Sequence, residues 1–251
     1  MPPPVPASAF DAAPAAARAL SVLRADRRRR TWSMIVTIMG DLTRGDGAAL
    51  PGARLRAILA RLDVSDQAVR TALHRLRADG WIETERRGRT SVHQLSATAL
   101  AQTRAVAPRV YGPAPPRPER WALVTARTVP DGAWTLEPGL HLKAGGLSGH
   151  DGLEGGTLRL SAVHRATLWP PALVAEAAAL RDRLHAAALP ACAAIGADMG
   201  AALRTLIVHD WRRIVLRAPD LPDALAPAAW CGASLRGDVQ TALARLSPTG
   251  T

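Results

Sequence analysis

The sequence predicts an α+β chain in three parts: a basic part of helices ending in a β-hairpin, a short mixed α/β part, and a helical C-terminal part. Apolar residues recur at helical spacing between residues 31 and 78, and a strand–turn–strand pattern follows over 81–95. The proline cluster GPAPPRP at 112–118 has no periodicity and indicates a linker. The predicted boundaries are a disordered leader at 1–20, an N-terminal domain at 21–111, the linker at 112–118, a middle domain at 119–170 and a helical C-terminal domain at 171–251.

The first 20 residues, MPPPVPASAFDAAPAAARAL, do not resemble an export signal, because they lack a basic start and contain prolines. No apolar run reaches the roughly 20 residues that a membrane span needs. The two cysteines, Cys192 and Cys231, do not indicate a disulfide framework. We therefore expect a cytoplasmic protein that makes no membrane contact.

The net charge of +11 favours a polyanionic partner. Because Lys143 is the only lysine among 32 basic residues, the total partly reflects a general preference for arginine. The distribution is more informative: residues 18–95 carry 16 basic and 8 acidic side chains, whereas residues 119–245 carry 13 and 12. The positive charge is therefore concentrated in the N-terminal part.

Two amphipathic helices are predicted at the start of the N-terminal domain. In residues 31–42, TWSMIVTIMGDL, the apolar positions follow the spacing i, i+3, i+4, i+7. In residues 51–62, PGARLRAILARL, one face carries Leu55, Ile58, Leu59 and Leu62.

A third helix is predicted between Ser65, a candidate N-cap, and Gly80, a C-terminal stop. Its apolar stripe comprises Val69, Ala72, Leu73 and Leu76. Its opposite face carries Gln67, Arg70, Thr71, His74 and Arg75. Gln pairs with adenine, Arg with guanine, and a Thr methyl contacts thymine, so this face suits reading of DNA bases. Taken alone, the face is equally consistent with an ordinary solvated helix surface.

The hairpin at 81–95 decides between these interpretations. Arg86, Arg87 and Arg89 surround Gly88 at its tip, where they are placed to contact phosphates or the minor groove. The order helix, helix, turn, helix, basic hairpin is typical of a winged helix-turn-helix domain. We therefore expect sequence-specific binding to double-stranded DNA. The residues expected to contact it are Ser65, Gln67, Arg70, Thr71, His74, Arg75, Arg86, Arg87 and Arg89.

Several segments of the chain resemble the PaaX family, whose members are repressors of phenylacetic acid degradation. The segment VSDQAVRTALHRLRADGWIETERRGRTSVHQLS, RVYG at 109–112, and HDWRRIVLRAPDLPDALAPAAWCG at 209–232 carry the resemblance. The chain departs from the family pattern at Trp211, where tyrosine is usual, and at Ala218, where aspartate is usual. The resemblance implies a ferredoxin-like middle unit and a homodimeric repressor on a palindromic operator, released by an aryl-acyl-CoA.

The effector site that we expect in the C-terminal domain comprises Arg204, His209, Asp210, Arg212, Arg213 and Trp230. Arginines suit CoA phosphates, and tryptophans supply apolar walls. Asp210 falls on the apolar stripe of its helix, so its carboxylate should be paired. The arginine run at 27–30 is either a solvated face or an arm on DNA phosphates.

No catalytic motif and no metal-ligand spacing is present, so we expect neither an enzyme, a metal site nor a cofactor. The alternative function is a nucleic-acid-binding module without small-molecule control. An enzyme in which the winged domain only supplies protein contacts is the weakest reading.

Overall fold

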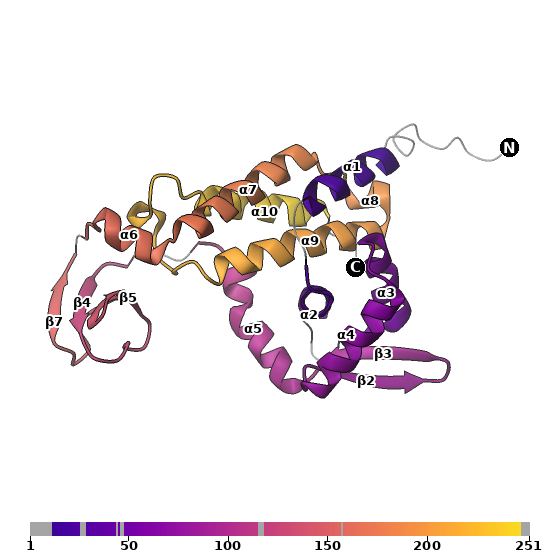
Figure 1. Ribbon diagram of the computed structural model, residues 1–251, viewed down its shortest axis with the longest axis horizontal. Helices are drawn as coiled ribbons and strands as arrows, with labels where there is room; N and C mark the ends of the chain where they lie inside the picture. Colours follow the sequence, from indigo (N-terminus) through magenta and orange to yellow (C-terminus); the bar gives the residue numbers. More distant parts are fainter. Residues whose placement is uncertain are drawn as a thin grey trace. The chain divides into compact units, whose positions relative to one another are not determined.

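The computed structural model describes residues 12–25, 29–43, 45, 48–114, 118–156 and 158–246, and Figure 1 shows its elements. The helices are α1 (Ala12–Arg24), α2 (Thr31–Leu42), α3 (Gly52–Arg61), α4 (Asp66–Ala78), α5 (Ala97–Tyr111), α6 (Ala162–Leu168), α7 (Pro171–Ala187), α8 (Cys192–Ile195), α9 (Ala197–Val215), the 3₁₀ helix η2 (Asp223–Leu225) and α10 (Gly232–Arg245). The strands are β1 (Leu50–Pro51), β2 (Ile82–Arg87), β3 (Thr90–Leu95), β4 (Trp121–Thr125), β5 (Ala133–Glu137), β6 (Leu140–Ala144) and β7 (Gly152–Gly155). The fold is thus mixed α+β, with helical N- and C-terminal parts and two small sheets.

The chain forms two compact units. Unit 1 joins the residues up to Gly112 with Leu180–Arg213 and the residues from Gly237 onward. Unit 2 consists of Pro113–Ala179 and Ile214–Arg236. The C-terminal segment that we expected to be a domain of its own, 171–251, is therefore divided between the two units.

Helix α1 begins inside the segment that we expected to be disordered. Its buried residues, Ala12, Ala16, Ala19 and Leu23, lie on one face, and α1 contacts α8. Alanine has the highest helix propensity, and burial of this face stabilises the helix further. The prediction of disorder is therefore wrong for residues 12–20, while residues 1–11 lie outside the described part of the chain.

The three helices and the hairpin predicted between residues 31 and 95 are confirmed as α2, α3, α4 and β2–β3. The turn between α3 and α4 contains Asp63 at φ 55°, a left-handed conformation that aspartate tolerates better than most residues. Ser65 then caps α4, its Oγ accepting a hydrogen bond from the Ala68 amide at 3.2 Å.

The hairpin belongs to an antiparallel sheet with the strand order β1-β3-β2. Its strands pair from Ile82 with Leu95 to Arg87 with Thr90, which leaves a two-residue turn. Gly88 comes first in this turn at φ 61°, a backbone conformation that glycine adopts without strain. The sheet approaches α3 closely at Gly52, since a Cβ there would lie 2.6 Å from Ser91 Oγ.

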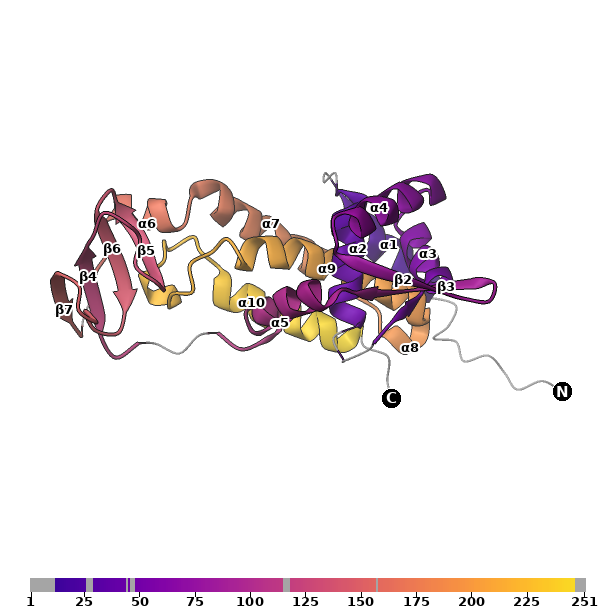
Figure 2. The same cartoon turned by 90° about the horizontal axis from the view of Figure 1, so that it is seen from below.

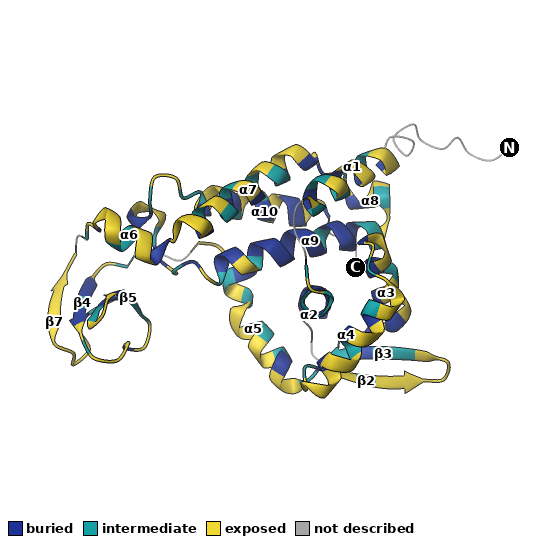
Figure 3. Cartoon of the chain, in the orientation of Figure 1, coloured by how far each residue is buried: buried dark blue, intermediate teal, exposed yellow. Residues whose placement is uncertain are grey.

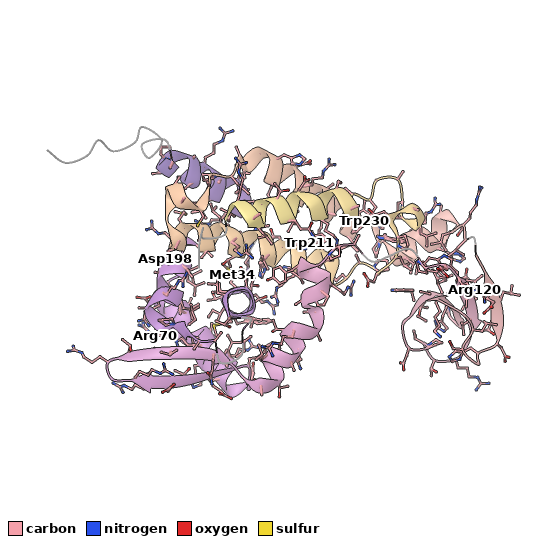
Figure 4. The ribbon with its side chains drawn as sticks, turned by 180° about the vertical axis from the view of Figure 1, so that it is seen from behind. Met34, Arg70, Arg120, Asp198, Trp211 and Trp230 are labelled. Carbon is pink, nitrogen blue, oxygen red and sulfur yellow. The ribbon has the colours of Figure 1, made fainter. Side chains whose placement is uncertain are left out.

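Helices α2 and α9 lie at the centre of unit 1, and Figure 3 shows both as mainly buried. Every residue of α2 from Met34 to Asp41 is buried, as is every residue of α9 from Thr205 to Trp211. Figure 4 shows side chains filling the space around α2, where Met34 is labelled. The N-terminal helices and α9 therefore share one core.

Unit 2 contains a four-stranded antiparallel sheet with the order β5-β6-β4-β7, which Figure 2 shows with α6 beside it. Its core includes Trp121, Leu142 and Trp169. The four strands follow one another along the chain without a helix between them. A ferredoxin-like unit instead has the order β-α-β-β-α-β, so that expectation is not confirmed. None of the described helices is long and apolar enough to cross a membrane.

Candidate nucleic-acid interface

An open groove of about 640 Å³ lies between the outward face of α4, helix α3 and the hairpin. Figure 4 shows Arg70 of α4 beside the hairpin. The groove is lined by Arg56, Gln67, Arg70, Thr71, Leu73, His74, Arg77, Thr84, Ser91 and His93. Four of the residues predicted to contact DNA, namely Gln67, Arg70, Thr71 and His74, therefore share one concave surface.

The other predicted contact residues lie outside the groove. Ser65 is occupied as the cap of α4. Arg75 lies 3.5 Å from Asp79 one turn along the same exposed helix surface. Arg86, Arg87 and Arg89 are exposed near the tip of the hairpin. Leu73, which we placed on the apolar stripe, is half-buried and lines the groove instead.

The cations of this surface differ in how far they are neutralised. Within the described residues, Arg56 and Arg77 have no carboxylate partner, and Arg70 Nη2 donates to Gln67 Oε1 at 2.8 Å. This bond holds the two candidate base-reading side chains together. At the hairpin tip, Arg87 donates to Glu85 at 2.8 Å, which lowers the pKa of Glu85 and raises that of Arg87.

His93 is a groove residue that the sequence did not single out. It is buried, and its Nδ1 lies 2.9 Å from Thr84 Oγ1, which fixes the ring against β2. Its Nε2 has no hydrogen-bond partner in the described part of the chain. Burial, and then the positive charges of Arg56 and Arg77, lower its pKa, so the ring is neutral beside these arginines at pH 7.

The residues predicted to bind an effector are divided between the two units: Arg204 to Arg213 belong to unit 1, and Trp230 belongs to unit 2. Asp41 of α2 accepts two bonds from the Arg204 guanidinium, one of them 3.0 Å long from Nη2 to Oδ1. Arg204 also donates to the Leu243 carbonyl at 2.8 Å. It therefore joins α9 to α2 and α10 within unit 1.

Asp210 is buried and paired, as its place on the apolar stripe predicts. Its Oδ2 lies 2.7 Å from Arg29 and 3.2 Å from Arg183. Arg29 is itself only 5% exposed, so it is neither a solvated cation nor an arm on DNA. The other described residue of that run, Arg30, forms no such pair, and 27–28 lie outside the described residues.

The neighbours of Asp210 on α9, namely His209, Trp211 and Arg212, make further polar contacts within unit 1. His209 Nδ1 lies 3.3 Å from Thr37 Oγ1, and Arg212 donates to Ser33 Oγ at 2.8 Å. Burial, and then Arg212, lower the pKa of His209 to about 4. Trp211, one of the two residues that depart from the family pattern, donates from Nε1 to the Val110 carbonyl at 2.8 Å.

The remaining two predicted effector residues are Arg213 and Trp230. Arg213 is exposed on α9. Trp230 belongs to unit 2, where its Nε1 donates to Asp223 Oδ1 at 3.1 Å. A Cβ on Gly232 would lie 2.3 Å from the same Nε1, which explains the glycine two residues after this tryptophan. In the described residues, no group of three or more His, Cys, Asp or Glu side chains is placed to hold a metal ion.

Two family models match this chain, one in its N-terminal part and one in its C-terminal part. The family model described as PaaX-like protein matches residues 30–99, and the model described as PaaX-like protein C-terminal domain matches residues 179–251. The transcriptional repressor PaaX of Escherichia coli (strain K12) is 25% identical over 241 residues, covering 81% of this chain and 76% of the relative. The uncharacterized protein Rv0674 from Mycobacterium tuberculosis is 18% identical, with a TM-score of 0.46 and coverage of 78% of this chain and 87% of that chain.

The similarity to the solved structure is too low to support an assignment. The two family models do support one. They occur in order along the chain and together cover more than half of it. The first contains all the elements that border the groove, and the second contains α9 and α10. The chain therefore belongs to the PaaX-like protein family.

Proposed function

We propose that the chain is a transcriptional repressor whose residues 31–95 form a winged helix-turn-helix module that binds double-stranded DNA. The observation that carries the proposal is the groove between α4 and the hairpin. It combines side chains suited to reading bases with Arg56 and Arg77, which lack carboxylate partners among the described residues. The similarity to a protein named as a transcriptional repressor supports the same conclusion.

The proposal gives different tasks to the residues on the two sides of this groove. Helix α4 has 13 residues, about 20 Å at a rise of about 1.5 Å per residue, and the major groove admits such a helix. Gln67, Arg70 and His74 then meet base edges, while Arg56 and Arg77 meet the phosphates beside them. The hairpin tip contacts the neighbouring backbone or minor groove.

The test measures binding of the full chain to an operator recovered by selection of genomic DNA and to a random duplex. Gln67→Ala and His74→Ala should each reduce the preference for the operator by about 1–3 kcal/mol, because base-edge contacts carry specificity. Arg127→Ala, an exposed arginine of unit 2, is the matched control and should leave both affinities unchanged. Equal losses on both duplexes for the α4 variants would contradict the assignment.

We further propose that the repressor is a homodimer on a palindromic operator, since paired half-sites double the short footprint of one winged module. Half-sites should then be separated by whole helical turns. Sedimentation of the full chain with and without operator tests this, and a monomer under both conditions would refute it.

The proposal includes release of the repressor by an aryl-acyl-CoA. A ligand shifts the DNA-bound state only if it binds the two states with different affinity. Arg204, Asp210 and Arg212 form contacts within unit 1, which a ligand bound by these residues would have to replace. Release of a bound operator fragment by phenylacetyl-CoA, and not by CoA alone, is the expected result.

A further inference from the structure

Two side chains on the outward face of α4 are joined to one another. Gln67 and Arg70 are three residues apart, so they lie side by side on the same face of the helix. Arg70 Nη2 donates to Gln67 Oε1 at 2.8 Å, and no described carboxylate pairs with Arg70. Both side chains are exposed and line the groove between α4 and the hairpin. The bond therefore lies on the surface that is proposed to meet DNA bases.

This bond changes what Gln67 offers to a base. A free glutamine reads adenine in two ways at once, because its carbonyl oxygen accepts from the N6 amino group and its amide donates to N7. In this chain the carbonyl oxygen already accepts from Arg70. Its second lone pair remains, but an amino group that approaches it meets the positive charge of the guanidinium. The amide N–H groups of Gln67 and the other N–H groups of Arg70 are all donors, so the pair presents mainly donors.

The rest of the groove is also poor in acceptors. None of the described residues that line it is Asp or Glu, the side chains that accept from the N4 amino group of cytosine. Thr84 Oγ1 and His93 Nδ1 lie 2.9 Å apart and are bonded to one another. The hydroxyls of Thr71 and Ser91 and the ring of His74 both donate and accept, so they do not oppose donors elsewhere. The groove therefore favours a base edge that carries acceptors.

We propose that Gln67 and Arg70 act as one donor unit that selects guanine in the operator half-site, and that Gln67 does not read adenine. Guanine has two acceptors on its major-groove edge, N7 and O6, and an arginine guanidinium meets both at once. Gln67 holds the guanidinium in place, which makes it a positioning residue for Arg70. This inference rests on the proposed function, because it names the base that the α4 face selects.

Base analogues test the inference on the full chain, in the operator recovered by selection of genomic DNA. At each guanine of the half-site, 7-deazaguanine removes the N7 acceptor, and at each adenine, unsubstituted purine removes the N6 amino group. For at least one guanine, the first change should weaken binding by the unchanged protein about tenfold and have little effect on binding by Arg70→Ala. Arg70→Lys should lose the same discrimination and keep its affinity for a random duplex, because lysine retains the charge without the planar fork.

Gln67→Ala should reduce the effect of 7-deazaguanine at that guanine severalfold, whereas Gln67→Glu, which keeps an acceptor for Arg70, should preserve it. Arg127→Ala, an exposed arginine of unit 2, should behave as the unchanged protein does. An adenine whose N6 amino group matters only while Gln67 is present would overturn the inference, as would the lack of any guanine whose effect depends on Arg70.

Binding to a random duplex is measured beside the operator and separates the two levels of the proposal. If the inference fails while the full chain still binds both duplexes, the DNA-binding proposal stands. If the full chain binds neither duplex, both are overturned.

Discussion

At the scale of single residues, the carboxylate of Asp210 is held by two arginines inside unit 1. It lies between Arg29 and Arg183 and is 2% exposed. Its pairing follows from its position on an apolar helix stripe, because an unpaired buried carboxylate is costly. The identity of Arg29 as partner does not follow, since 181 residues separate the two and no local pattern relates them.

Replacing Asp210 by Asn should lower the free energy of unfolding by about 3–5 kcal/mol, because Arg29 then stays buried without its counter-charge. Chemical denaturation measures this. Asp182→Asn, an exposed carboxylate on α7, is the matched control and should change stability by less than about 0.5 kcal/mol. Equal effects of the two substitutions would show that the pair contributes nothing specific.

His209 makes stability depend on pH. Burial, then Arg212, lower its pKa from 6.5 to about 4 in the folded chain, so between these values the unfolded chain binds more protons. Its contribution is therefore fully present above pH 6.5 and declines as the pH falls toward 4, by roughly 3 kcal/mol in total. As the pH is lowered from 6.5 to 4, the melting temperature should fall less for His209→Gln than for the unchanged protein. Parallel pH profiles would contradict the assignment to His209.

At the scale of elements, local patterns predict α2, α3, α4 and the hairpin well, because each has a clear period and a stop signal. The same patterns do not predict how completely α2 is buried. Its apolar stripe suggests one buried face, yet Thr37 and Asp41 are buried too, since α9 supplies partners for both. In the groove, Arg56 and His93 escaped prediction because they come from α3 and β3, and only the tertiary fold brings them to α4.

Two substitutions near the hairpin tip should change DNA affinity in opposite directions. Arg89→Ala removes one candidate phosphate contact and should reduce the slope of log affinity against log salt by roughly 0.9. Glu85→Gln releases Arg87 from its exposed ion pair and should instead strengthen binding to any duplex. Fluorescence anisotropy over a salt series measures both. Unchanged slopes for both variants would place the tip away from DNA.

At the scale of the whole molecule, the division into two units could not be read from the sequence. The proline cluster marks where the chain leaves unit 1, but nothing local indicates that 180–213 and the residues after Gly237 return to it. That return depends on contacts such as Arg204 with Asp41, between residues 163 positions apart. The elements proposed to bind DNA therefore share their core with α9 and the C-terminal part of α10.

This shared core predicts the behaviour of a truncated chain. A fragment that ends at Gly112 lacks α9, which leaves the α2 face around Thr37 and Asp41 uncovered. It should be largely unfolded or aggregated, with circular dichroism showing far less helix per residue than the full chain. A monomeric, cooperatively folded fragment would show that the N-terminal elements are independent of α9.

The central claim is that double-stranded DNA occupies the groove between α4 and the hairpin. The most direct test substitutes Arg56 and Arg77 together by Ala in the full chain and compares it with the matched pair Arg127→Ala and Arg159→Ala, which are exposed cations of unit 2. Binding to any duplex should weaken for the first pair, with the salt slope reduced by roughly 1.8, and stay unchanged for the second. Equal binding by both double variants would contradict the claim.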